Sequence, residues 1–317
     1  MTITVQGIGV VGGFGCGVQA LAEALGRTPG GRTPDGRTPD GLERRADPAP
    51  LDRFVPRRGQ RRLDPLARIT ALAAHLALED AGLPPAQWER LGVVVASGYG
   101  ATGTTLAMID SIIEGGDACT SPIHFAGSLH NAPAAHLAML LGAKGPNLTV
   151  SQFHLSVPSA LMAAKLWLDQ GRVERVLFGG VDELSELIAY LWSRRDEMER
   201  PLGPPGVPCG EGAAFVLLSA RAEARAPYCS LEWASTGQGP PPDLGDPGQV
   251  LRAGDLTPLV GCMPAAPAFD LAAAAIRLRA EGGPERVTCL TFDGSGGYGV
   301  ARLGAPRTLG NLGPPAG

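Results

Sequence analysis

Short apolar, β-branched stretches alternate with longer segments of helical periodicity along most of the chain. The apolar stretches predict buried strands at residues 3–11, 91–97, 148–150, 173–180, 213–219 and 287–292. Helical spacing predicts helices at residues 18–25, 65–81, 103–114 and 160–168. Strands that alternate with helices in this way are typical of a layered α/β fold.

Residues 26–42 interrupt this pattern with a low-complexity insert. The unit Gly-Arg-Thr-Pro occurs three times within it. Proline, glycine and charge at this density do not supply a packed core. We therefore expect the insert to be a mobile surface loop.

Length and charge restrict the class of protein. The chain has 317 residues, 44% of them hydrophobic, which is enough for one large α/β domain or two coupled halves. The net charge of -4 does not favour a nucleic-acid partner for the chain as a whole. The N-terminus lacks the charged region of a secretory signal, and the longest uncharged stretch, 118–143, carries three histidines. We expect a cytoplasmic protein without membrane insertion.

Three motifs argue against a cofactor or metal when their context is considered. Gly7-x-Gly9-x-x-Gly12 matches a dinucleotide fingerprint, but the insert occupies the place where the acidic residue of a second strand is needed. The six cysteines show no CxxC pair or metal-ligand spacing, which favours reduced, mostly buried thiols. His130 and His136 do not share a helix face well, and no carboxylate accompanies them. We expect no cofactor and no metal.

The most informative segment is the turn between the strand at 148–150 and the helix at 160–168. Such a turn holds one side chain at a helix N-terminus, where the helix dipole favours an anion such as a thiolate. The chain places His154 there. The same dipole disfavours an imidazolium, so we expect the neutral imidazole.

This turn resembles the nucleophile turn of the β-ketoacyl synthases, with His154 where that family places its cysteine. Other stretches are similar to the family in the same order, at residues 5–11, 78–83, 93–100, 121–138, 179–183, 210–214 and 291–298. The resemblance implies a thiolase-type, five-layered αβαβα fold and an obligatory dimer. It places one ketosynthase-like half at 1–220 and a shortened second half at 221–317.

The departures from the family concern its chemistry. A working ketosynthase needs a cysteine nucleophile and two histidines. One histidine lies in an HGTGT loop, which residues 237–256 replace here, and the other aligns with Cys262. The family's gating phenylalanine aligns with Ser295. We therefore expect no catalytic residue at the degenerate positions His154, Cys262 and Ser295.

The resemblance favours a subunit of the chain-length-factor type in type II polyketide or fatty acid biosynthesis. Such a subunit pairs with an active β-ketoacyl synthase in a heterodimer and shapes the acyl tunnel. Met108, Ile109 and Ile112 on the helix at 103–114 are the expected tunnel residues. Arg57, Arg58, Arg61 and Arg62 are the expected docking site for an acidic acyl carrier protein, with a solvated charged face as the competing interpretation.

Two other functions stay open at this point. A stand-alone decarboxylase or acyltransferase would use the neutral imidazole of His154 as a base or weak acyl acceptor, although the sequence shows no acid that would orient it. Cys262 is either a relocated nucleophile or an ordinary small core residue. The second open function is a homodimeric acyl-binding protein, which would be neither a chain-length-factor subunit nor an enzyme.

Overall fold

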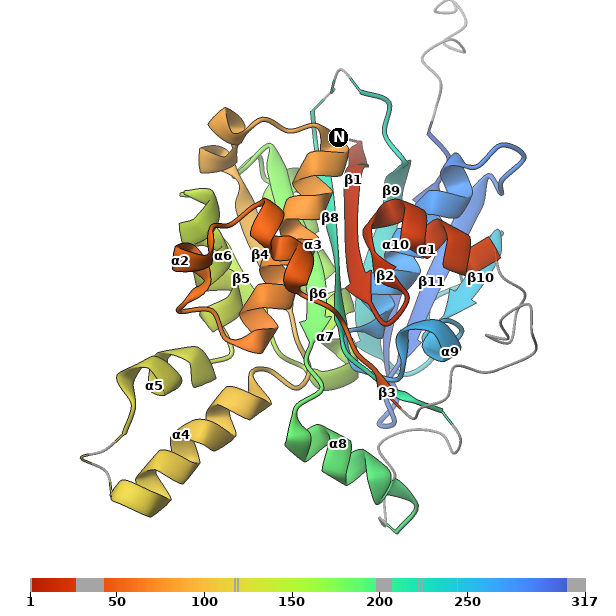
Figure 1. Cartoon of the computed structure of the whole chain (residues 1–317). Coiled ribbons are helices and arrows are strands. Elements are labelled where there is room, and N and C mark those ends of the chain that lie inside the picture. The colour runs from red at the N-terminus through yellow and green to blue at the C-terminus, as the bar shows by residue number, and fades with distance from the viewer. Residues whose placement is uncertain are drawn as a thin grey trace, which may run out of the picture.

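A mixed β-sheet organises the molecule, as the computed structural model in Figure 1 shows. The structure describes residues 2–26, 43–116, 118, 120–197, 207–221, 223, 225–243 and 245–306. The strand order is β10-β11-β12-β9-β1-β8-β6-β4-β5, with β2 beside β1. The strands are β1 Ile3–Gly12, β2 Gly15–Cys16, β4 Gly92–Ala96, β5 Asn147–Val150, β6 Arg175–Asp182, β8 Gly212–Ser219, β9 Cys229–Gln238, β10 Gln249–Arg252, β11 Arg286–Phe292 and β12 Gly297–Gly304.

The sheet contains both parallel and antiparallel strand pairs. β4 runs parallel to both β5 and β6, whereas β8 runs antiparallel to its neighbours β6 and β1. β1 also pairs with β9, which joins the strands that precede residue 220 to those that follow it. A second, small sheet pairs β3 (Glu43–Arg44) with β7 (Cys209–Gly210).

The helices form layers on this sheet. They are α1 Gly17–Gly26, α2 Arg57–Gln60, α3 Pro65–Ala81, α4 Thr102–Gly115, α5 Pro122–Ser128, α6 Ala132–Leu141, α7 Ser156–Asp169, α8 Glu186–Ser193, α9 Thr257–Val260 and α10 Ala266–Arg279. Short 3₁₀ turns are η1 Ala49–Arg53, η2 Pro85–Arg90, η4 Phe153–Leu155 and η5 Arg195–Glu197. α3 packs on β1, β6 and β8, and α6 packs on β4 and β5.

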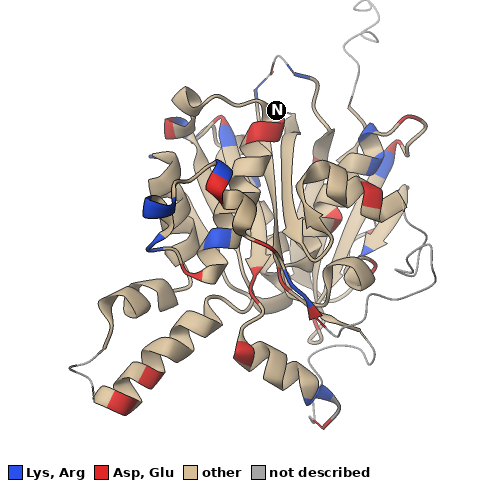
Figure 2. Ribbon diagram, viewed as in Figure 1, with Lys and Arg blue, Asp and Glu red and all other residues tan. Residues whose placement is uncertain are grey.

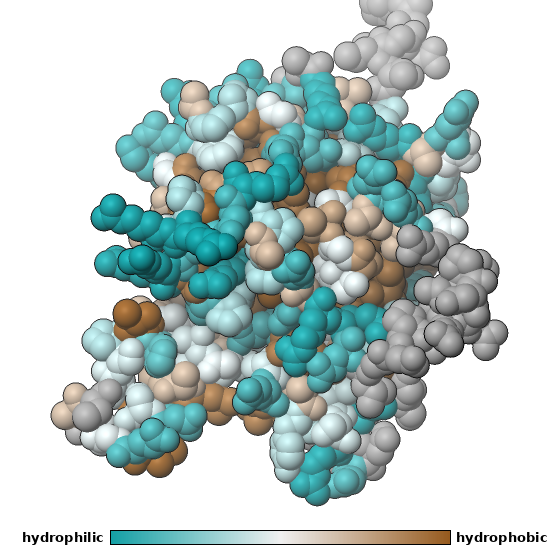
Figure 3. All heavy atoms as spheres, viewed as in Figure 1, coloured by the Kyte–Doolittle hydropathy of each residue, from teal (hydrophilic) through white to brown (hydrophobic). Residues whose placement is uncertain are grey.

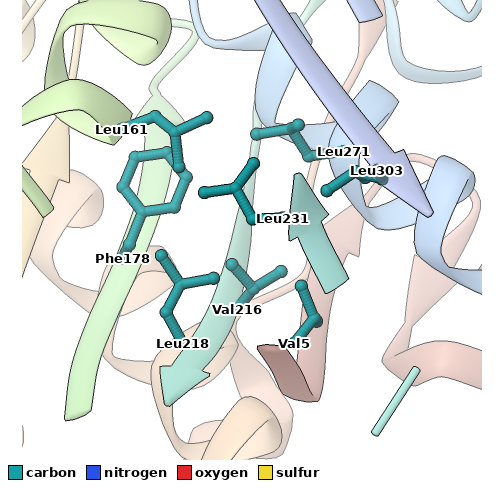
Figure 4. Close-up of a pocket in the computed structure, with 8 residues that line it drawn as sticks. All are labelled: Val5, Leu161, Phe178, Val216, Leu218, Leu231, Leu271 and Leu303. Carbon is teal, nitrogen blue, oxygen red and sulfur yellow. The ribbon is translucent and has the colours of Figure 1, made fainter. Parts of the chain in front are cut away.

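The middle layer is made by α7 and α10. α7 packs against β4 and β6 on one side and against β9 and β12 on the other, while α10 reaches both β8 and β11. Leu161 of α7 and Leu271 of α10 meet side chains of β1, β6, β8, β9 and β12 around a void of about 10 Å³ (Figure 4). The layered α/β fold expected from the sequence is confirmed; the boundary between halves at residue 220 stays a prediction.

Glycines in β1 explain why α3 lies so close to the sheet. A Cβ on Gly9 would lie 2.0 Å from the carbonyl oxygen of Ala73, and one on Gly7 would lie 2.3 Å from that of Ala77. These two glycines therefore serve helix packing from within a strand, and not from a turn. At its start, α3 is capped by Asp64, whose side chain accepts from the backbone N–H of Ala67.

The repeat insert and the possibility of a membrane-spanning helix are the remaining expectations about the fold. The repeat insert at 26–42 lies outside the described residues apart from Gly26, the last residue of α1. Among the helices that the structure describes, none combines the length and the apolar character needed to cross a membrane.

Candidate functional site

The turn that follows β5 is held by Ser156, the first residue of α7. The backbone N–H of Gln152 donates to Ser156 Oγ at 2.8 Å. The Ser156 hydroxyl in turn donates to the carbonyl oxygen of Phe153 at 2.7 Å. Phe153 has φ = 48°, the left-handed region that a bulky residue avoids. A strained backbone held by its surroundings is typical of a functional turn. The strain falls on Phe153, next to His154.

His154 is half-buried, and burial lowers the pKa of its imidazole. The charge of Asp293 opposes this shift and raises the same pKa. The expected neutral imidazole agrees with the direction of the shift, although its main cause is burial and not the helix dipole.

Asp293, in the loop between β11 and β12, lies beside this turn. Its carboxylate accepts from the backbone N–H groups of Gly297 at 2.6 Å and Ser295 at 2.9 Å. The first of these hydrogen bonds is the main cause that lowers the pKa of Asp293. A Cβ placed on Gly297 would lie 2.5 Å from Asp293 Oδ2 and 2.7 Å from Leu155 Cδ1, so the carboxylate packs against the turn.

The sequence shows no acid that would orient His154, and the structure adds a nearby carboxylate, that of Asp293. Neither described side chain hydrogen-bonds the other, yet Asp293 lies close enough for its charge to act on the imidazole. Asp293 could not be located from the sequence, because it is more than 130 residues from His154 and reaches the turn only through the β11–β12 hairpin. Ser295, the third degenerate position, is exposed in the same loop.

Aromatic rings close the site on the β4 side. The ring of Phe153 lies 5.8 Å from that of Tyr99 and 4.3 Å from the imidazole of His154. Tyr99 packs in one cluster with Cys262 and Cys209. Burial raises the pKa of the Tyr99 phenol, which remains protonated.

Cys262 lies near these rings without the features of a nucleophile. Burial raises the pKa of its thiol. An activated cysteine needs a neighbouring cation or helix N-terminus that lowers this pKa. The thiol is thus held in its unreactive, protonated form. The backbones of Cys209 and Cys262 form an isolated parallel β-bridge. Burial also raises the pKa of the Cys209 thiol, to about 11.

Two buried carboxyls at the end of β6 hold the site together. Asp182 accepts from Ser97 Oγ and from the backbone N–H groups of Gly98, Tyr99 and Ala265, at 2.7–2.9 Å. Complete burial raises its pKa to about 6 despite these hydrogen bonds. Asp182 thereby joins the turn after β4 to the start of α10.

Glu183 fixes the start of α4 in the same way. Its Oε1 accepts from the backbone N–H of Gly103 at 2.7 Å, while the N-cap residue Ala101 has no capping side chain. Burial, followed by the nearby carboxyls of Asp64 and Glu211, raises the pKa of Glu183 to about 7. The helix that carries the expected tunnel residues therefore starts at the site.

The expected tunnel residues divide into two kinds. Met108 faces α5, because its Sδ accepts a hydrogen bond from Ser128 Oγ at 3.5 Å. Ile109 and Ile112 are 40% and 38% exposed. α4 and α5 together project from the body of the molecule in Figure 1, and we call them the arm.

The arm continues into an exposed apolar surface around the open edge of β5, the last strand of the sheet. We call this surface, carried by helices α4 to α7 and β5, the seam. The exposed fractions of its most accessible large apolar residues run from 46% to 76%, for Ile113, Ile123, Phe125, Leu129, Met139 and Leu166. Brown atoms on the arm in Figure 3 show part of it. An open strand edge flanked by apolar side chains is typical of a protein interface.

The arginines expected to dock a carrier protein lie on and beside α2. All four are exposed, and Figure 2 shows them as a blue group. Arg57 pairs with Asp52 at 3.3 Å, whereas Arg58, Arg61 and Arg62 pair with no carboxylate of the described chain. The structure thus keeps this cluster apart from the turn of His154. Within the described residues, no group of three or more histidines, cysteines or acids is arranged to hold a metal.

Comparison of the sequence with known proteins identifies a family and its relatives. The model of the "Beta-ketoacyl synthase, N-terminal domain" family matches residues 36–224. The chain is 24% identical over 188 residues to 3-oxoacyl-[acyl-carrier-protein] synthase 2 of Vibrio harveyi and 27% identical over 186 residues to Nodulation protein E of Rhizobium meliloti (strain 1021). Each match covers 55% of this chain but only 45% and 46% of the respective relative, less than half of its length.

Two solved structures are similar over nearly the whole chain. One is "AntDE:AntF (apo): type II PKS acyl-carrier protein in complex with its ketosynthase bound to the hexaketide", with a TM-score of 0.82 and 16% identity, covering 96% of this chain and 99% of that one. The other is "The ishigamide ketosynthase/chain length factor", with a TM-score of 0.73 and 20% identity, covering 97% and 100%. At these identities the likeness concerns the fold.

Proposed function

The chain belongs to the β-ketoacyl synthase family, and on that premise we propose that it is a non-elongating subunit of the chain-length-factor type. It pairs with an active β-ketoacyl synthase and shapes the acyl tunnel of a type II polyketide or fatty acid pathway. The observation that carries this proposal is the turn after β5. There Phe153 is held at φ = 48° and the next residue presents the imidazole of His154 where the resemblance places a cysteine, while burial raises the pKa of the Cys262 thiol.

The seam supports pairing with a second subunit. An open strand edge and a patch of exposed apolar side chains are costly to leave in water, and covering them on association is favourable. The arm begins at the site and forms part of this seam, so a partner bound there would lie next to the arm. An acyl chain that passes between the two subunits would then meet the side chains of α4.

The arginine cluster supports the second proposed partner, an acyl carrier protein. Three of its guanidinium groups lack a carboxylate partner within the described chain, and they present an exposed positive surface. Such a surface attracts an acidic protein from a distance and speeds its association.

Purification from the native host tests the pairing. The chain, tagged and kept at its natural level, is isolated, and the native mass of the complex and the identity of its subunits are measured. A complex of this 32.6 kDa chain with one cysteine-bearing ketosynthase is the expected result. A pure homodimer, or a monomer without any ketosynthase, would contradict the proposal.

Asp293 is the reason to keep a second candidate, a stand-alone decarboxylase or acyltransferase. A carboxylate beside His154 supplies the charge that stabilises an imidazolium after it has taken a proton. In a decarboxylation, the carboxyl group of a malonyl thioester leaves as carbon dioxide and the remaining enolate takes a proton. The purified chain alone is assayed for carbon dioxide release or acyl transfer. Activity that His154→Ala abolishes supports this candidate, and an inactive wild-type chain rejects it.

A further inference from the structure

The arm, which is part of the seam, carries acids and neither lysine nor arginine. Residues 91–143, which include α4, α5 and α6, contain neither lysine nor arginine. Asp110 and Glu114 on α4 are exposed, and neither has an ion pair or a hydrogen bond to another described side chain. Figure 2 shows the acidic residues of α4 in red. Their negative charge is therefore uncompensated within the described part of the subunit.

The two lysines of the chain do not compensate this charge. Lys144, at the start of the loop before β5, pairs with Glu89 at 2.6 Å. Lys165, on the α7 side of the seam, pairs with Asp169. Each of the two lysines is thus already paired with a carboxylate of its own subunit.

This distribution of charge has different consequences for like and unlike pairs. A two-fold symmetric homodimer brings the same surface of both copies into one interface. Two acid-only arms then contribute negative charge to the same interface without a cation on either arm to pair with it, and like charges at an interface are unfavourable. A partner with lysine or arginine on its own arm removes this repulsion and adds attraction.

We infer that the acid-only arm selects an unlike partner: a subunit of the same fold that presents basic side chains to Asp110 and Glu114. The apolar side chains of the seam supply the driving force for association, because they lose contact with water in any dimer of this kind. The acids supply the choice of partner, because discrimination needs a repulsive element against the wrong complex. This inference rests on the proposed pairing and specifies the chemistry of the partner's surface.

The test uses the chain itself, so it does not depend on an identified partner. A charge-reversed arm, Asp110→Lys with Glu114→Lys, is prepared as a purified full-length variant and mixed with the wild-type chain. Dimer dissociation constants are measured by sedimentation for wild type alone, for the variant alone and for the mixture. We expect the mixture to associate about tenfold more tightly than either protein alone at about 50 mM salt. The difference should shrink at about 500 mM salt because exposed charges are screened.

Two controls separate this effect from a general change in charge or folding. Glu281→Lys with Glu285→Lys makes the same change in net charge on exposed acids between α10 and β11, and its mixture with wild type should show no preference. Asp110→Asn with Glu114→Asn removes the repulsion and should strengthen self-association. Equal dissociation constants for all pairs, or an equal effect of the control variant, would overturn the inference.

The outcome is separable from that of the proposed function. If the mixture shows the preference but no ketosynthase purifies with the chain from its host, the arm selects an unlike partner and the chain-length-factor proposal fails. If a ketosynthase copurifies and the charge variants bind it as the wild type does, the pairing stands and the inference about the acids fails.

Discussion

Glu183 Oε1 accepts a hydrogen bond of 2.7 Å from the backbone N–H of Gly103, the second residue of α4. A carboxylate at this place satisfies a helix N–H that has no partner within the helix and lies at the positive end of the helix dipole. Its other oxygen is buried and has no hydrogen-bond partner among the described residues. Glu183 therefore holds the arm to the body of the molecule while carrying a costly buried charge.

Glu183→Gln should change how stability depends on pH. The pKa of Glu183, about 7 in the fold, lies above its ordinary value of 4.5, so the native state binds more protons than the unfolded state between these values. Stability conferred by the protonated group is complete below about pH 4.5 and is lost as pH rises to about 7, at up to about 1.4 kcal/mol per pH unit. Glutamine keeps an acceptor for Gly103 and does not titrate.

Urea unfolding at several pH values measures this effect. The decline of the free energy of unfolding between pH 4.5 and 7 should be shallower in the variant, and part of the decline should remain because the pKa of Asp182 is also raised, to about 6. An identical pH profile for wild type and Glu183→Gln would show that Glu183 does not titrate in this range.

Backbone strain at Phe153 can be measured with two substitutions that remove the same ring. Glycine accepts a positive φ without cost, whereas alanine retains a Cβ and the strain. Phe153→Gly should therefore be more stable than Phe153→Ala by about 1 kcal/mol, apart from the greater flexibility of glycine in the unfolded chain. Thermal unfolding of both variants gives the difference. A less stable glycine variant would mean that the turn does not hold Phe153 at φ = 48°.

The elements that follow from local pattern were accessible from the sequence. The strand and helix at either side of His154 were expected because apolar, β-branched residues precede the turn and helical spacing follows it, and the structure has β5 and α7 there. α10 was not expected, since eleven of its residues are buried and it has no polar face to give periodicity. β9 was missed because it mixes polar and apolar residues.

The site shows the same division. His154 and Cys262 were recognised because each stands in a motif. Asp293, in contrast, reaches the turn only through the β11–β12 hairpin, and Glu183 acquires its raised pKa from burial that no linear motif records. Contacts between residues distant in sequence depend on how the sheet closes, and this is the information that local pattern lacks.

Close packing of α3 on β1 predicts that Gly9→Ala is strongly destabilising. The new Cβ would lie 2.0 Å from the carbonyl oxygen of Ala73, and both atoms belong to elements that lack room to move apart. A loss of several kcal/mol, or failure to fold, is expected, on the order of the larger core effects. Gly26→Ala is the matched control, because none of the described residues packs within 4 Å of the new Cβ, and it should leave the unfolding midpoint nearly unchanged.

The arginine cluster predicts a salt-dependent interaction with acyl carrier protein. Replacing Arg58, Arg61 and Arg62 by glutamate should lower the association rate with a purified carrier protein about tenfold or more at low salt, because these exposed charges steer the encounter. Arg286→Glu, on β11, serves as a control for charge reversal outside the cluster, and it also removes the ion pairs of Arg286 with Glu232 and Asp246, which the three cluster arginines lack. Surface plasmon resonance at two salt concentrations gives the rates. If the triple variant and the control bind alike, the cluster is a solvated face and not a docking site.

Met108 offers the sharpest test of the tunnel, because it lies midway along α4 and faces α5. Its sulfur contacts Ser128, so a smaller side chain opens space between the two helices and a larger one fills it. In the reconstituted complex with its ketosynthase, Met108→Ala should lengthen the product and Met108→Trp should shorten it. Ile113→Ala, at an exposed position on the same helix, controls for loss of partner binding. Product masses are compared by mass spectrometry at equal complex concentration. Unchanged product lengths in both Met108 variants, with the complex intact, would exclude Met108 from the tunnel wall.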